Sequence, residues 1–380
     1  MDSLLMKSNI RNTSIEEWKQ KGGKTIGTIC CHVPGEIFHA AGLLPVRLRA
    51  TGCTDDSEGE VWMSSFACSF ARSCFELLLD GTYDFLDGIV SSDGCSMATR
   101  IYDNYKYYKK KEDSNKFYLK DIGAPRINNT KHALPYYISE LNELKAGLEN
   151  HFGVEITEEK LKKSIAVFNE SRELVRELYE LRKSDAPVIT GADSLKITLA
   201  SVSMPPEEFN AMLKKYLAEL KTRKPLNDYR ARLMLIGSAI DDPEYIKVIE
   251  DKGGLVVCDA TCYGSRQLWE PVACEGEAIA SIAKSYLDKT VCPRMSQVST
   301  HNELYDMIIR MVKDFKVDGI VYAKMKNCQV WGSETLYFED DLKAANIPLL
   351  VVEREEIMTN AGQLAIRAEA FIEMVEKEDN

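Results

Sequence analysis

The sequence lacks several features that would assign it to a common class. No apolar run approaches the ~18–20 residues that a helix needs to span a bilayer. The first residues, MDSLLMKSNIRNTS, contain neither a continuous apolar segment nor a small-residue cleavage site, so they do not indicate a secretory signal. A net charge of −11 argues against binding to a nucleic-acid backbone, which requires a basic surface. We therefore expect a cytoplasmic protein with no nucleic-acid or membrane partner.

Paired cysteine motifs are also missing, although cysteine itself is abundant. The chain has eleven cysteines, and no two of them form a CxxC motif. An odd number without a secretion signal is poor evidence for disulfides, and without CxxC pairs a zinc ribbon or knuckle is unsupported. Buried free cysteines behave as small hydrophobic residues, so about half of them are expected to be core filler. The presence of the remaining cysteines requires a chemical explanation.

Length and periodicity predict two domains. A chain of 380 residues exceeds one ordinary core, and 45% hydrophobic with 28% charged residues is typical of a globular protein. Strand-like and helix-like segments alternate over residues 1–131 and again over 224–380, whereas 132–223 has long amphipathic helical patterns. The expected fold class is α/β. It has two domains, each with a doubly wound parallel sheet, joined by the helical segment, with a ligand cleft between them.

One short stretch occurs twice. DFLDGIVSSDGC (84–95) and DFKVDGIVYAKMKNC (314–328) both contain Asp-Gly-Ile-Val and run into a cysteine. A tetrapeptide can recur by chance, but each copy falls on a predicted central strand of its own half. Ligands of open α/β sheets bind beyond the carboxyl ends of the strands. Cys95 and Cys328 are therefore predicted to face one cleft from two domains.

The same positional argument applies to other cysteines. Cys68 lies near the start of a predicted helix, where backbone N–H groups favour a thiolate or an anionic cluster. Cys262 follows a strand and precedes Gly264, which lets backbone approach closely. Cys30 and Cys31 end the first strand, where neighbours point to opposite faces. Only one of these two is expected to enter the cleft.

Other cysteines are predicted to be packing residues. Cys74 comes six residues after Cys68 in one helix, about 240° of rotation away, so the two cannot share a ligand direction. Cys258 lies inside a strand, and Cys292, before Pro293, lies in a loop that position alone does not assign. The cysteines predicted not to bind a metal cluster are Cys53, Cys74, Cys258 and Cys274.

Longer motifs resemble a known family. They are GTICCHVPGEIFHAAGLLPVRL (27–48), FACSFARSCFELLLDGTYDFLDGIV (66–90), KNCQVWGSETLYFEDDLKAANIPLLVVE (326–353) and GQLAIRAEAFIEM (362–374). These motifs resemble those of the 2-hydroxyacyl-CoA dehydratase and benzoyl-CoA reductase superfamily and run almost from end to end. The resemblance implies that an iron–sulfur cluster is held by Cys68, Cys95 and Cys328.

Two departures from the usual dehydratase pattern favour one branch of the superfamily. Dehydratase subunits usually carry Asp directly after the second and third cluster cysteines, where this chain has Ser96 and Gln329. Cysteines also occur in TCYGSR (261–266) and VCPRM (291–295), as in the double-cubane branch. That resemblance implies a double-cubane [8Fe–9S] cluster, with one [4Fe–4S] cluster as the alternative. The six implied ligands are Cys30, Cys68, Cys95, Cys262, Cys292 and Cys328, with Cys31 as the alternative to Cys30.

The resemblance also implies a function. An ATP-hydrolysing iron–sulfur activator protein would supply single low-potential electrons, and the cluster would pass them to a small-molecule substrate. One alternative is a [4Fe–4S] subunit of a dehydratase or benzoyl-CoA reductase that acts on an acyl-CoA thioester; another is a non-catalytic electron-storing protein. The family further implies a dimer of two such chains, alike or related.

Besides its cysteines, the first motif contains Glu36, His32 and His39, which are its candidates for proton transfer. A helix that begins at Pro34 puts Glu36 in its first turn, where the helix dipole is a sufficient reason for a carboxylate. Proton transfer by Glu36 or His32 is the alternative. No catalytic acid or base is assigned from the sequence.

Overall fold

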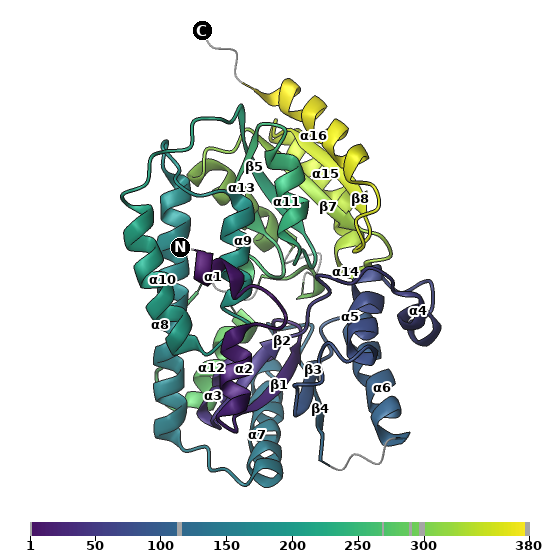
Figure 1. Ribbon diagram of the computed structural model, residues 1–380, viewed down its shortest axis with the longest axis vertical. Coiled ribbons are helices and arrows are strands. Elements are labelled where there is room, and N and C mark those ends of the chain that lie inside the picture. Colours follow the sequence, from purple (N-terminus) through teal and green to yellow (C-terminus); the bar gives the residue numbers. More distant parts are fainter. Residues whose placement is uncertain (1, 112–115, 268–269, 289–290, 296–300, 377–380) are drawn as a thin grey trace.

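The computed structural model describes residues 2–111, 116–267, 270–288, 291–295 and 301–376, and it contains two four-stranded sheets (Figure 1). The first sheet has the order β2-β1-β3-β4, with β1 Lys24–Ile29, β2 Leu43–Arg47, β3 Gly88–Ser92 and β4 Tyr118–Ile122. The second has the order β6-β5-β7-β8, with β5 Ala231–Gly237, β6 Gly254–Ala260, β7 Gly319–Met325 and β8 Leu349–Arg354. All these strand pairs are parallel, so the predicted fold class is confirmed.

Helices cover both faces of the first sheet. One face packs against α2 Thr13–Gln20, α5 Ser69–Leu79 and α6 Ser96–Lys111. The other packs against α3 Gly35–Ala40, α7 Ala133–Phe152, the first part of α8 Glu158–Lys183, and α12 Ala278–Asp288. Two short helices, α1 Asp2–Met6 and α4 Ser57–Met63, lie near the N-terminal part of the chain. Helix α12 thus comes from the second half of the sequence but packs on the first sheet.

The second sheet is covered in the same way. One face packs against α9 Gly191–Ala200, α11 Pro243–Glu250 and α16 Ala361–Val375. The other packs against the rest of α8, α10 Pro206–Leu220, α13 His301–Asp314, α14 Gln329–Gly332 and α15 Glu334–Ala344. Helix α8 therefore runs along both units, as Figure 1 shows. Two 3₁₀ turns, η1 Ser265–Gln267 and η2 Pro293–Met295, follow β6 and α12. Among the described residues, no helix is long and apolar enough to cross a membrane.

The repeated Asp-Gly-Ile-Val occupies equivalent positions in the two sheets. Strand β3 lies between β1 and β4, and strand β7 lies between β5 and β8. The Asp87 carboxylate accepts a hydrogen bond from the Thr25 backbone N–H (2.9 Å), and the Asp318 carboxylate accepts one from the Arg232 N–H (2.8 Å). Each Asp therefore ties the start of its strand to the neighbouring first strand.

The Gly, Ile and Val residues of the repeat also occupy equivalent surroundings in the two sheets. A Cβ on Gly88 would lie 2.7 Å from the backbone oxygen of Tyr118, so this position requires glycine. A Cβ on Gly319 would lie 2.6 Å from the Phe371 ring and would have to displace it. Ile and Val then enter the cores on opposite faces of the sheet in each copy. The recurrence is therefore one supersecondary unit used twice.

Candidate functional site

One cavity, with an empty volume of about 870 Å³, is lined by cysteines from both halves of the chain. It lies where the loops after β1, β3, β6 and β7 meet, beyond the carboxyl ends of both sheets. The structure brings together every cysteine that the sequence proposes as a ligand. The cysteines that line this cysteine cavity are Cys30, Cys31, Cys68, Cys74, Cys95, Cys262, Cys292 and Cys328.

Three of these cysteines directly precede helices, and we call them the helix-end group: Cys68 before α5, Cys95 before α6 and Cys328 before α14. The Cys95 Sγ accepts a hydrogen bond from the backbone N–H of Ala98 at 3.4 Å. Backbone N–H groups three residues further on, those of Ala71 and Trp331, reach Cys68 and Cys328 in the same way. This geometry follows from a strand–cysteine–helix turn and stabilises negative charge on sulfur.

Burial opposes ionisation of these thiols. Burial and, to a smaller extent, the neighbouring Cys328 raise the pKa of Cys68 to about 12. Burial likewise raises the pKa of Cys95 and of Cys328, and the N–H groups only partly offset it. The thiols of the helix-end group thus remain protonated until a cation takes the place of their protons. Metal binding does this, because the thiolate is the ligand.

The other candidates, Cys30, Cys31, Cys262 and Cys292, lie in loops, and we call them the loop group. The backbone turns at Cys30, whose φ is 78°, instead of continuing as a strand. The prediction that only one of Cys30 and Cys31 enters the cleft is therefore wrong, because strand alternation ends at Ile29 and both residues line the cavity. A Cβ on Gly94 would lie 2.3 Å from the Cys30 sulfur, so this turn packs on a glycine.

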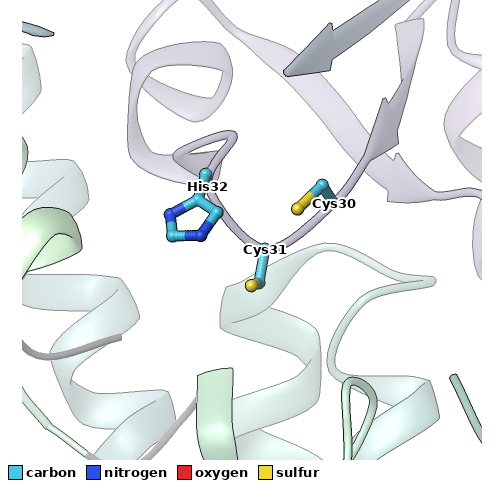
Figure 2. Close-up of side chains that lie close together, drawn as sticks. All are labelled: Cys30, Cys31 and His32. Atoms are coloured by element: carbon cyan, nitrogen blue, oxygen red, sulfur yellow. The ribbon is translucent and has the colours of Figure 1, made fainter. Parts of the chain in front are cut away.

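Cys30, Cys31 and His32 lie on consecutive positions of this bend (Figure 2), with their ligand atoms all within 4.8 Å of one another. A hydrogen bond from the Cys31 thiol lowers the pKa of Cys30, and the same contact raises the pKa of Cys31. Burial lowers the pKa of His32 to about 4, so its ring is neutral. Neither ring nitrogen of His32 has a hydrogen-bond partner among the described residues. Three donors are one fewer than a structural zinc site takes from the protein.

Two buried arginines that the sequence analysis missed line the same cavity. The Arg266 guanidinium donates from Nε to the Val291 oxygen (2.9 Å) and from Nη1 to the Cys262 sulfur (3.7 Å). Arg47 donates from Nη1 to the Cys262 oxygen at 2.7 Å. Both side chains are buried. The sequence did contain signals for both arginines. Arg47 ends the buried strand pattern LPVR, and Arg266 lies close to a cysteine in TCYGSR.

A second cavity, with an empty volume of about 960 Å³, adjoins the first. Cys30, Cys31, Arg47 and Arg266 line both, so they form the partition between them. The rest of its wall mixes hydroxyl groups, a guanidinium and a carboxylate with apolar side chains, including Ser171, Ser285, Tyr286, Arg172, Glu270, Val33, Phe168 and Met204. A small polar molecule in this second cavity would lie directly beside Cys30 and Cys31.

Glu36 lies in the first turn of α3, as predicted, but its carboxylate has a further role. It is fully buried and forms an ion pair with the Arg172 Nη2 at 2.6 Å. The Tyr286 hydroxyl donates to its second oxygen at 2.8 Å. Arg172 and Tyr286 both line the second cavity. His39 instead contacts Ser164 and Glu207, and it lines neither of the two cavities.

Replacing Glu36 by glutamine should destabilise the protein strongly. It leaves the Arg172 guanidinium buried without its counter-charge, which typically costs about 3–5 kcal/mol. The free energy of unfolding in denaturant measures the loss. E207Q is the control, since Glu207 is half-exposed in its pair with His39 and should cost at most about 1 kcal/mol. An E36Q variant as stable as E207Q would contradict the assignment of this ion pair.

The cysteines expected to be non-ligands occupy different surroundings. Cys258 is fully buried inside β6, Cys53 donates a hydrogen bond to the Asp55 oxygen at 3.2 Å, and Cys274 is exposed. None of these three lines the cysteine cavity. Cys74 does line it, from the buried side of α5.

The chain is similar to components of known enzymes. It is 28% identical over 364 residues to one of the subunits of benzoyl-CoA reductase of Thauera aromatica, covering 93% of this chain and 90% of the relative. It is 25% identical to the beta subunit of lactoyl-CoA dehydratase of Anaerotignum propionicum, covering 95% of each chain. With the beta subunit of (R)-2-hydroxyglutaryl-CoA dehydratase of Acidaminococcus fermentans it shares 23%, again covering 95% of each.

A profile of the family "2-hydroxyglutaryl-CoA dehydratase, D-component" matches residues 30–375. That range includes the cysteine motifs and both sheets, apart from strand β1. The prediction of an enzyme component is confirmed, since the relatives named above are all subunits of enzymes. The chain belongs to the 2-hydroxyglutaryl-CoA dehydratase D-component family, within the superfamily that its cysteine motifs resemble.

Proposed function

We propose that this chain holds an iron–sulfur cluster in the cysteine cavity and uses it to pass low-potential electrons to a small molecule. The observation that carries the proposal is the convergence of six candidate ligands, from both halves of the chain, on one cavity. Thiolates are the ligands that iron–sulfur clusters require, so the donor set fits the group. The proposed ligands are Cys30 or Cys31, Cys68, Cys95, Cys262, Cys292 and Cys328.

Such a cluster supplies one-electron chemistry at low potential. The chain's own residues adapt the site to it. Apolar side chains such as Ile29, Leu48 and Ile101 exclude water, and backbone N–H groups of α5 and α6 donate toward sulfur. The guanidinium groups of Arg47 and Arg266 offset the negative charge that thiolates and sulfides bring.

The double-cubane form is favoured by the number and grouping of the ligands. A single [4Fe–4S] cluster binds at most four cysteines, so the helix-end group alone would nearly complete it. The loop group then has no metal to bind, although it lines the same cavity. The alternative is a [4Fe–4S] subunit of a 2-hydroxyacyl-CoA dehydratase or benzoyl-CoA reductase, as the relatives' names suggest. A non-catalytic electron store is disfavoured by membership among enzyme subunits.

The second cavity is the proposed substrate site, because it shares a wall with the cysteine cavity. Its hydroxyl groups and Arg172 suit a small polar molecule or the acyl end of a CoA thioester. An ATP-dependent activator protein is the proposed electron donor. The buried pair of Glu36 with Tyr286 is the candidate for moving a proton at this cavity, since the phenol already donates to the carboxylate.

Iron and acid-labile sulfide per chain, measured after purification without oxygen, test this function. We expect about eight irons for the double cubane, whereas one [4Fe–4S] cluster gives about four. A chain that purifies and reconstitutes without iron would overturn the proposal. Substrate turnover that requires the activator and ATP then separates an enzyme from an electron store.

We also propose that the protein forms a dimer, of identical or related chains, as the family resemblance implies. Sedimentation at micromolar concentration in anaerobic buffer should give twice the mass of the 42.9 kDa chain for a homodimer. A monomer under these conditions would rule out the homodimer. A monomer that also fails to pair with any related chain co-expressed from the same source would contradict assembly altogether.

A further inference from the structure

The two groups of cysteines have different electrostatic surroundings, which matters if the double cubane of the proposed function is present. The helix-end group meets backbone N–H donors at helix starts. The loop group meets two full positive charges, Arg47 and Arg266. The cysteine cavity is therefore electrically asymmetric.

Arg266 is the centre of the positive side. It connects the Cys262 sulfur with the backbone oxygen just before Cys292, and its guanidinium lies 5.4 Å from the Trp331 ring. It is only 5% exposed, and its Nη2 has no hydrogen-bond partner among the described residues. Because this side chain lines both cavities, free N–H donors are available to a ligand at the partition.

Side chains near the helix-end group contribute no net positive charge. Behind Cys68, the Ser69 hydroxyl accepts from the Glu356 backbone N–H at 2.7 Å. Glu356 pairs with Arg354 at 3.2 Å, and a second buried carboxylate, Asp241, accepts from the Ala50 N–H at 2.6 Å. Two carboxyl groups thus accompany one guanidinium on this side.

A further ion pair, Arg294 with Asp93 at 2.8 Å, lies beside Cys95 and is neutral. On the loop side Arg172 is matched by Glu36. The guanidinium groups of Arg47 and Arg266 come in addition to these, and both line the cysteine cavity. The positive charge of that cavity's own lining is therefore concentrated on the loop group.

Magnitudes favour the arginines over the helix ends. A helix N-terminus is equivalent to roughly half a positive charge, and its effect fades within the first turn. One of the three helices, α14, has only four residues. A guanidinium carries a full charge at every pH that proteins tolerate. Two of them in a buried site outweigh the helix dipoles on the other side.

We propose that Arg47 and Arg266 make the loop group the half of the site at which an added electron is held. In this step a reduced iron–sulfur donor protein loses one electron and the cluster gains it, with no bond or proton transferred. The electron then rests at the partition, beside the second cavity. The two arginines act as positioning residues, since they select which half is reduced first.

The reduction potentials of arginine variants test this. R266Q removes one charge, whereas R266K keeps it. R232Q is the matched control, because Arg232 is also buried and donates to the backbone oxygens of Phe315 (3.0 Å) and Arg182 (2.9 Å), but it lines neither cavity. Potentials are followed by EPR during anaerobic titration of the iron-loaded protein. We expect R266Q to make the first one-electron reduction at least tenfold less favourable, about 59 mV.

R266K should stay within about threefold of the unchanged protein, and R232Q should not move the potential. If R266Q loses iron, R47Q replaces it, with the same expected shift. An unchanged reduction potential in iron-loaded R266Q or R47Q would overturn the inference. Loss of iron in both variants would also overturn it, because the arginines would then be needed to assemble the cluster. Failure of the double-cubane proposal would give a different result from failure of this inference. In that case the protein without substitutions would contain only about four irons per chain, which is one cubane.

Discussion

Serine at Cys95 or at Cys328 should remove at least half of the iron and lower the thermal midpoint of the protein. Each residue follows its own Asp-Gly-Ile-Val strand, one in each sheet, and both line one cavity. A cluster bound by both would hold the two halves together, so its binding free energy is part of folding stability. Each kcal/mol lost lowers the midpoint by roughly 1–2 °C in a protein of this size, and a fall of several degrees is expected.

Two matched variants separate loss of metal from loss of packing. Cys258 is fully buried in β6, away from the cavity, so C258S should lower stability and leave iron unchanged. Cys74 lines the cavity but is predicted not to bind, so C74S should also keep its iron. Full iron content in C95S or C328S would end the shared-cluster account. Loss of iron in C74S would show that the proposed set of cluster ligands is wrong.

Serine at Cys262 or at Cys292 should reduce the iron content by about half. In the double-cubane proposal these loop residues hold one cubane, and the helix-end group keeps the other, so about four of eight irons remain. The remaining cluster should still give a low-potential EPR signal. C30S and C31S, measured in the same series, identify which of the two binds iron, because only the ligand's replacement should lower the count.

The contrary outcomes are equally distinct. If C262S and C292S keep all iron while C95S loses all of it, the chain holds a single [4Fe–4S] cluster on the helix-end group. If C262S loses all iron, the two halves are not separable units. C274S, at an exposed cysteine outside the cavity lining, should match the unchanged protein in every measurement.

Much of this site could be predicted from the sequence because it follows from strand and helix periodicity. The alternation of strands and helices predicts two parallel sheets, and the carboxyl ends of parallel strands predict where Cys95, Cys262 and Cys328 meet. Cys68 at a helix start is equally local information. These expectations depend on residues close in sequence to the elements that place them.

The features that sequence analysis missed depend on long-range packing. The left-handed turn at Cys30 is fixed by contact with Gly94, which no local propensity reveals. The pairing of Glu36 with Arg172 joins residues 136 positions apart, and helix α12 carries Tyr286 across to the first sheet. Arg266 was part of a quoted motif, but its role depends on loops that meet only in the folded chain.

An anomalous-scattering map at the iron edge, from crystals grown without oxygen, tests the central claim most directly. We expect one continuous iron assembly in the cysteine cavity, in contact with both Cys95 and Cys328 and extending to Cys262 and Cys292. Iron confined to the bend of Cys30, Cys31 and His32, or no iron between the two sheets, would contradict it.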